Sequence, residues 1–287
     1  MDTVILIDKP EGFSSHETVG LVKKRLGVKK AGHTGTLDPV ATGLLIVCTG
    51  EATKIGRFLT DLPKRYEAIL KVGERTETFD SEGEVTERGP VPADAKPLLE
   101  ALSPFRGRIR QVPPMYSALK VSGTPLYRLA RQGVQVAREE REVEISELEL
   151  LGYTPPFAKL LIACSKGTYI RALADDIGLA AGSFAHITGL RRLAIGPFDV
   201  RDSASPEDFD EAKPAAFFTI DQALGFFLEE LSIGGEDLRR ASNGAPFRTN
   251  LPIAGSVRIK DPEGKLLGIG TALKGLVRVE RLLRLSS

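Results

Sequence analysis

The hydrophobic positions near the N-terminus predict a strand, a turn and a helix. Residues 3–7 form an apolar strand that leads into a turn at 9–12, where proline and glycine favour a chain reversal. Ser14 and Glu17 have the spacing of a capping box, and apolar residues then repeat at helical intervals up to Gly27. The pattern therefore predicts a helix that begins after Ser14 and ends before Gly27.

Alternating and helical patterns predict further elements along the chain. The segment 32–43 contains three glycines and one proline, which predicts a loop, and a buried strand follows at 44–48. Later strands are predicted at 65–78, 142–151 and 157–164, and helices at 92–102 and 168–181. Because these elements show no regular βαβ order, we expect an α+β fold with a mixed, largely antiparallel sheet flanked by helices.

The composition changes near Leu231, and this change predicts two domains. Residues 231–287 contain ten Lys or Arg against five Asp or Glu, a net charge of +5, so the first 230 residues carry −4 of the overall +1. Apolar runs at 257–259 and 266–270 flank a turn and predict a hairpin, which a strand-like segment at 275–284 follows. We therefore expect a larger domain at 1–230 and a small basic, β-rich module at 231–287.

Composition excludes several classes of protein. With 42% hydrophobic and 27% charged residues in 287, the chain is neither collagen-like nor wholly disordered. Its two cysteines and three histidines lack the spacing of a disulfide framework or a zinc site, so no metal is expected. No apolar run approaches the roughly 18 residues of a membrane span. These features predict a soluble, cytoplasmic protein.

Motif searches leave one loop as the candidate for chemistry. The chain has no GxxxxGK[ST] phosphate loop, so a nucleotide cofactor is not expected, and it has no GxSxG, so a serine hydrolase is only a weak alternative. Asp38 stands between Leu37 and Pro39, where partial burial would make it a nucleophile or a base. Local spacing alone favours an Asx-turn or a helix N-cap for this aspartate.

Several separate motifs, taken together, favour a catalytic role for Asp38 over this structural one. They are KPEGFSS at 9–15, GHTGTLDPVATG at 32–43, KRYEA at 64–68, QVPPMYSALK at 111–120 and SKGTYIR at 165–171, with LRR at 190–192. In wording and order they resemble the bacterial tRNA pseudouridine-55 synthases, the TruB family. Ser14 stands where that family usually has threonine. The module at 231–287 is similar in size and hairpin content to the PUA-like RNA-binding module of these enzymes.

The resemblance implies a reaction and a set of catalytic residues. Uridine 55 in the T loop of tRNA would be flipped out and isomerised to pseudouridine, without a cofactor or a metal. Asp38 would act at C1′, at C6 or as a base, and the residues leave these routes open. Arg171 would keep Asp38 ionised, Tyr66 would stack on the base, Tyr169 would line the pocket, and His33 would lie near the vacated stack.

The resemblance also gives the basic clusters an expected role. Lys9 and Leu190 are further substrate-binding residues that it implies. The expected phosphate contacts are Lys23, Lys24, Arg25, Lys29, Lys30, Arg131 and Arg191, together with Arg192 and the basic module. We expect tRNA as the partner of a monomer with no obligate protein partner. The alternatives are a non-catalytic RNA-binding or RNA-folding protein and a guide-RNA-dependent relative.

Overall fold

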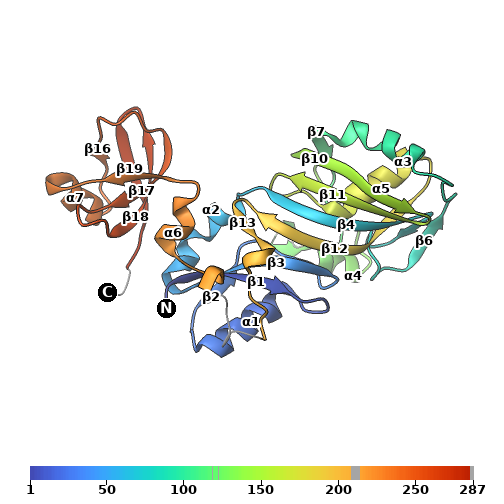
Figure 1. Cartoon of the computed structure of the whole chain (residues 1–287), viewed down its shortest axis with the longest axis horizontal. Helices are drawn as coiled ribbons and strands as arrows, with labels where there is room; N and C mark the ends of the chain where they lie inside the picture. Colours follow the sequence, from blue (N-terminus) through green and yellow to red (C-terminus); the bar gives the residue numbers. More distant parts are fainter. Residues whose placement is uncertain (118, 122, 208–213, 285–287) are drawn as a thin grey trace.

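The structure, a computed structural model, describes residues 1–117, 119–121, 123–207 and 214–284. Ala118 of the motif at 111–120 and residues 285–287 of the C-terminal module lie outside these ranges. Figure 1 shows a large body built on one long sheet and a smaller body, formed by the C-terminal residues, at one end of it. None of the helices described combines the length and apolar character needed to span a membrane.

The large body is built on a ten-stranded mixed sheet. Its main path runs β14 (Phe217–Thr219), β1 (Thr3–Lys9), β3 (Ala41–Thr49), β12 (Ala185–Ile195), β4 (Lys64–Val72), β11 (Phe157–Cys164), β10 (Arg141–Thr154) and β7 (Gly107–Gln111). Two short strands, β2 (Ala31–His33) and β13 (Phe198–Asp199), pair with β3 and β12. Among the described strands of this sheet, only the β3–β12 pair is parallel. These findings confirm the predicted α+β fold with a mixed, largely antiparallel sheet.

Helices and small ribbons surround this sheet and build its cores. The helices are α1 (Ser15–Leu26), α2 (Gly56–Thr60), α3 (Lys96–Ala101), α4 (Leu126–Arg131), α5 (Ile170–Ala180) and α6 (Ile220–Gly225), with 3-10 turns at Gly50–Ile55, Ser103–Phe105, Val200–Asp202 and Pro214–Ala216. The ribbons are β5 (Glu74–Thr76) with β6 (Val85–Arg88), and β8 (Lys120–Val121) with β9 (Thr124–Pro125). Apolar residues of α5 and α3 share one core with β4, β10, β11 and β12, so α5 is fixed directly against the sheet.

The C-terminal module has a sheet and a core of its own. Five strands, β15 (Glu229–Ser232), β17 (Gly255–Lys260), β18 (Leu266–Leu273), β19 (Leu276–Leu282) and β16 (Phe247–Arg248), form the sheet, and α7 (Gly235–Ser242) packs beside it. Leu266, Ile269 and Leu283 instead belong to the core that β1, β3, α2 and α6 build in the large body. Figure 1 shows the C-terminal module beside α6 and α2, at the left end of the large body.

Local sequence signals predict some elements and miss others. The capping box at Ser14 and the left-handed Gly27 bound α1 as predicted, and both strands of the C-terminal hairpin are present. The strand expected at 65–78 ends at Val72, because Gly73 takes a φ of 98° and starts a separate ribbon. The helix expected at 92–102 is confined to Lys96–Ala101. The sequence analysis missed β12, whose middle reads as polar.

Candidate active site

The loop of residues 34–40, between β2 and β3, carries Asp38, and neighbouring segments hold it in one conformation. The Ser15 hydroxyl donates to the Leu37 carbonyl at 3.0 Å and accepts from the Leu37 N–H at 2.8 Å. The Pro39 carbonyl accepts from the Gly12 N–H at 2.9 Å. These bonds fasten the residues on both sides of Asp38, so its carboxylate has a fixed position. Sequence analysis quoted Ser15 only as part of a motif and did not assign it this role.

Lys9 supports the same loop from inside the protein. Its side chain is fully buried, and Nζ donates to the carbonyls of Pro10 at 2.9 Å, Phe13 at 2.6 Å and Pro39 at 3.3 Å. An ammonium has three N–H donors, and all three are used here. Lys9 does not line either pocket beside Asp38. In this structure Lys9 holds the loop, and the substrate contact expected of it stays a prediction.

Arg192, on β12, also holds the loop. Its guanidinium donates to the carbonyls of Leu44 at 2.6 Å and Gly35 at 3.1 Å, and reaches that of Thr36 at 3.5 Å. The residue is 1% exposed but lines the cavity beside Asp38, so it is not presented on the outer surface, and the phosphate contact expected of it stays a prediction. Such bonds depend on strands distant in sequence, and no local pattern at 190–192 signals them.

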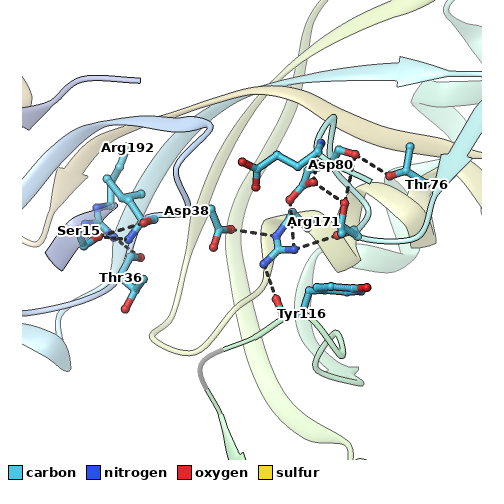
Figure 2. A network of polar contacts seen from close by, with 11 residues as sticks. Ser15, Thr36, Asp38, Thr76, Asp80, Tyr116, Arg171 and Arg192 are labelled. Atoms are coloured by element: carbon cyan, nitrogen blue, oxygen red, sulfur yellow. Dashed lines mark hydrogen bonds and ion pairs between the residues drawn. The ribbon is translucent and has the colours of Figure 1, made fainter. Parts of the chain in front are cut away.

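Arg171, in the first turn of α5, joins the Asp38 loop to two other segments. Its Nε lies 2.9 Å from an Asp38 carboxylate oxygen and its Nη1 lies 3.2 Å from Asp80. The same group donates to the carbonyls of Thr78 at 2.9 Å and Tyr116 at 2.7 Å. Figure 2 shows the Asp38 and Arg171 side chains pointing toward one another, with Asp80 beyond the guanidinium. The predicted Asp38–Arg171 pair is present, and Asp80 is a second carboxylate that sequence analysis did not assign.

The electrostatic environment of Asp38 combines two opposing effects. Burial disfavours its charged form and raises the pKa of the carboxyl group, and the nearby Asp80 charge adds to this rise. The Arg171 guanidinium opposes both effects and lowers the pKa of Asp38, as Lys9 does more weakly. Arg171 is itself nearly buried, with 7% of its side chain exposed, whereas Asp38 is 36% exposed. The carboxylate therefore faces open space while its charge partner is fixed in the protein.

A cavity of about 270 Å³, here called the Tyr66 pocket, opens directly beside Asp38. Five of the predicted catalytic and substrate-binding residues line it: Asp38, Tyr66, Tyr169, Arg171 and Leu190. Tyr66 from β4 and Leu190 from β12 lie on adjacent strands, where Tyr66 pairs with Arg192. Burial raises the pKa of Tyr66, so its phenol is neutral at ordinary pH.

The backbone of Tyr169 is fixed where α5 begins. The Gln111 side chain accepts from its N–H at 2.8 Å and donates to its carbonyl at 3.0 Å. The Arg141 guanidinium lies over the Tyr169 ring, 5.2 Å from its centre. Arg171 is only two residues after Tyr169. The contacts that fix Tyr169 therefore also help to position the guanidinium beside Asp38.

A second cavity of about 420 Å³, here called the His33 pocket, lies on the other side of the Asp38 loop. His33 and His16 line it together with Arg131, and Asp38 and Arg171 border both pockets. Burial lowers the pKa of His33, which favours a neutral ring. Nδ1 of His33 has no hydrogen-bond partner among the described residues. A neutral, half-buried imidazole presents a flat face suited to stacking on a base.

The remaining basic residues predicted to contact RNA lie away from the two pockets, except Arg131. They are Lys23, Lys24 and Arg25 in the last turn of α1, and Lys29 and Lys30 just beyond it. Arg131 packs against the Tyr127 ring at 5.7 Å. Arg191 forms an ion pair with Asp8 at 2.7 Å, which neutralises part of its charge. No group of three or more His, Cys, Asp or Glu side chains in the described residues is placed to hold a metal ion.

Comparison with known proteins places this chain among the pseudouridylate synthases. The N-terminal domain of TruB family pseudouridylate synthases matches residues 23–170, and the C-terminal domain of tRNA pseudouridylate synthase B matches 171–224. The chain belongs to the TruB family, which confirms the resemblance seen in the motifs.

Individual relatives agree over nearly the whole chain. The tRNA pseudouridine synthase B of Stutzerimonas stutzeri is 45% identical over 292 residues, covering 98% of this chain and 95% of the relative. That of Haemophilus influenzae is 41% identical, covering 100% and 97%. A chain of a Cbf5-Nop10-Gar1 complex superimposes with a TM-score of 0.74 at 26% identity, covering 98% of this chain and 84% of that one.

Proposed function

We propose that this protein converts uridine 55 in the T loop of tRNA to pseudouridine, with Asp38 as the catalytic carboxylate. Pseudouridine formation in tRNA follows from its family and from relatives named tRNA pseudouridine synthase B. The observation that carries the residue assignment is the carboxylate of Asp38, which borders both pockets and is paired with the buried Arg171 at 2.9 Å.

The two pockets suit the two parts of a flipped nucleotide. A uridine stacked inside a folded loop cannot reach a recessed carboxylate, so it must leave the stack. The base then enters the Tyr66 pocket, where the Tyr66 ring contacts its face and Leu190 borders its edge. His33, in the adjoining pocket, contacts the RNA near the position that the base has left.

Asp38 is placed for each of the three routes that the sequence leaves open. Breaking the N1–C1′ bond builds positive charge at C1′, which a carboxylate stabilises or captures. Attack at C6 and proton removal also require the ionised form. Arg171 supplies that requirement, because a fixed cation offsets the desolvation that raises the pKa of Asp38.

We further propose that the enzyme acts as a monomer in the cytoplasm, without a guide RNA or an obligate protein partner. The support is that a single chain brings the predicted catalytic residues Asp38, Tyr66 and Arg171 together at one pocket, so the proposed chemistry needs no residue from a second subunit. Cys48 and Cys164 are buried free thiols, as a reducing compartment favours.

The test is to incubate the purified protein alone with an unmodified tRNA transcript and to map pseudouridine. We expect modification at position 55 and none in a transcript with cytidine there. Asp38→Asn should bind the same tRNA but give no multiple turnover, since the amide keeps the size and loses the charge. Binding without modification by the wild-type protein would support a non-catalytic RNA-binding role, and modification only with an added guide RNA would support the guide-dependent alternative.

A further inference from the structure

Two buried cations that the proposed mechanism has not used form part of the Tyr66 pocket. Lys64, at the start of β4, is 8% exposed, and Arg192, on the neighbouring β12, is 1% exposed. Lys64 lies two residues before Tyr66 on the same face of β4, and Arg192 is the partner of Tyr66 on the neighbouring strand. Both cations therefore lie around the ring on which the base is expected to rest.

These cations differ from Arg171 in their partners. Within the described residues, neither has a carboxylate at ion-pair distance, whereas Arg171 has two. Lys64 donates to the backbone carbonyls of Thr60 and Leu62, the latter at 2.6 Å. A buried charge that lacks a counterion is costly, so such groups are typical of functional sites.

The reaction supplies the missing negative charge. If Asp38 attacks C1′, the N1–C1′ bond breaks and its electron pair stays on the base, which becomes a uracil anion beside a neutral ester. If Asp38 adds to C6, the C5–C6 electron pair moves toward C4 and leaves an enolate on O4. If a proton is removed from the sugar, the base again departs as the anion. All three routes put one negative charge on the pyrimidine. When C5 bonds to C1′ the charge returns to Asp38, which is released from the ester or the C6 adduct, or gives its proton back to the sugar. Loss of the C5 proton and gain of a proton at N1 then complete pseudouridine with no net change of charge.

We propose that Lys64, reinforced by the field of Arg192, stabilises the negative charge that develops on the base. Lys64 contacts the pocket, so it acts directly, while Arg192 keeps its N–H groups on loop carbonyls and acts through its charge. The inference rests on the proposed function and adds an anion-binding role to the same pocket. Preorganised donors of this kind act mainly in the transition state, so ground-state tRNA binding should not depend on Lys64.

The first test compares variants at Lys64 under single-turnover conditions. Lys64→Gln removes the charge but keeps a donor for the two carbonyls, and Lys64→Met removes the charge but keeps the side-chain volume. If either variant melts cooperatively, a lower rate in that variant reports the loss of the positive charge and not a loss of folding. We expect a rate about 100-fold lower than wild type, the usual size of the effect when one donor of this kind is removed, with the tRNA dissociation constant within about two-fold. Lys64→Arg should restore at least about a tenth of the wild-type rate. The control is Lys71→Gln, on the same strand but paired with Glu74 at 2.6 Å, which should react like wild type.

The second test changes the base. A 5-fluorouridine at position 55 has nearly the same size, but its fluorine stabilises the base anion and reduces the need for a nearby cation. We expect the rate deficit of the neutral Lys64 variants to fall below about 10-fold, measured as loss of 5-fluorouridine in nuclease digests. Equal deficits for the two substrates, or neutral variants as fast as wild type, would overturn the inference while leaving the proposed function intact. A wild-type protein that modifies neither substrate would reject the proposed function itself.

Discussion

At the scale of single residues, arginines that look alike in the sequence have different partners in the structure. Arg171 has two carboxylate partners and controls the charge of Asp38. Arg192 instead binds the carbonyl of Gly35 in the Asp38 loop and that of Leu44 in β3. Arg191, its immediate neighbour, points the other way and pairs with Asp8. The alternation of a β-strand explains this difference, since successive side chains point to opposite faces of the sheet.

The coupling of Asp38 and Arg171 predicts a pH dependence. The proposed mechanism requires the Asp38 carboxylate, and burial raises its pKa, so the rate should fall on acidification at a pH above the ordinary range of aspartate. Arg171→Ala removes the largest influence that lowers this pKa, so the acid limb should move to higher pH. Arg171→Lys keeps a charge and should move the limb less. Single-turnover rates between about pH 5 and 8 measure the shift, and a limb at the wild-type position in a folded Arg171→Ala would contradict the pairing.

Residues in recognisable motifs could be predicted as site residues, whereas the contacts that their side chains make with distant segments could not. Asp38, Tyr66 and Arg171 lie in motifs whose order identified the family, and the structure brings them together at one pocket. Lys9 lies in an equally clear motif, yet its contacts come from folding 9–13 against Pro39. A motif identifies a residue without showing whether its side chain faces the pocket or the interior.

At the scale of elements, the Asp38 loop is positioned because it joins strands that are themselves constrained. β3 runs parallel to β12, with Leu190 opposite Ala41 and Arg192 opposite Gly43. A parallel pair inside an otherwise antiparallel sheet places the end of the loop next to the middle of β12. The loop residues, Leu190 and Tyr66 thereby converge from three neighbouring strands.

Gly43 lies where β3 and β12 approach each other closely, so a side chain at this position would push the two strands apart. It has a φ of 98°, and a Cβ there would lie 2.3 Å from the Arg192 carbonyl oxygen. Gly43→Ala should therefore destabilise the protein by at least about 2 kcal/mol and reduce activity, because strand and loop must separate. The matched control is Gly20→Ala in α1, where a Cβ meets nothing within 4 Å. That change should raise stability by about 0.5 to 1 kcal/mol. Denaturant melts check both, and an unaffected Gly43→Ala would contradict the close approach.

Elements with strong end signals were predictable, whereas β12 was not. α1 has a capping box at one end and a left-handed glycine at the other, so its bounds follow from local chemistry. β12 contains Thr188, Gly189 and two arginines, which read as polar. It is a strand because β3 and β4 flank it and satisfy its backbone groups, and this tertiary pairing overrides local propensity.

At the scale of the whole molecule, the C-terminal module is fastened to the large body. Lys54 donates to the Leu282 carbonyl at 3.1 Å, Glu51 accepts from the Arg284 N–H at 2.7 Å, and Arg57 pairs with Glu280. Removing the module would expose the apolar residues that it covers, so a truncated chain would lose stability as well as any RNA contacts. Substitution of its surface charges is therefore a cleaner test of RNA binding than deletion.

The charges available for such a test lie on one face of the module. Phe247 and Val277 pair across β16 and β19 and are both buried, so Arg248 and Arg278 point to the opposite, exposed face, and Lys274 is exposed in the turn before β19. Changing all three to Gln should weaken tRNA binding and reduce the slope of log affinity against log salt by roughly 0.7 to 0.9 for each phosphate that the module no longer neutralises. The rate under single-turnover saturation should stay the same, because these residues are not among those lining the pockets beside Asp38. Lys96→Gln, an exposed charge on α3, is the control and should leave the slope unchanged. A triple variant with a wild-type slope and an unchanged melting temperature would show that this face does not meet RNA, and the basic module would then serve only to cover the large body.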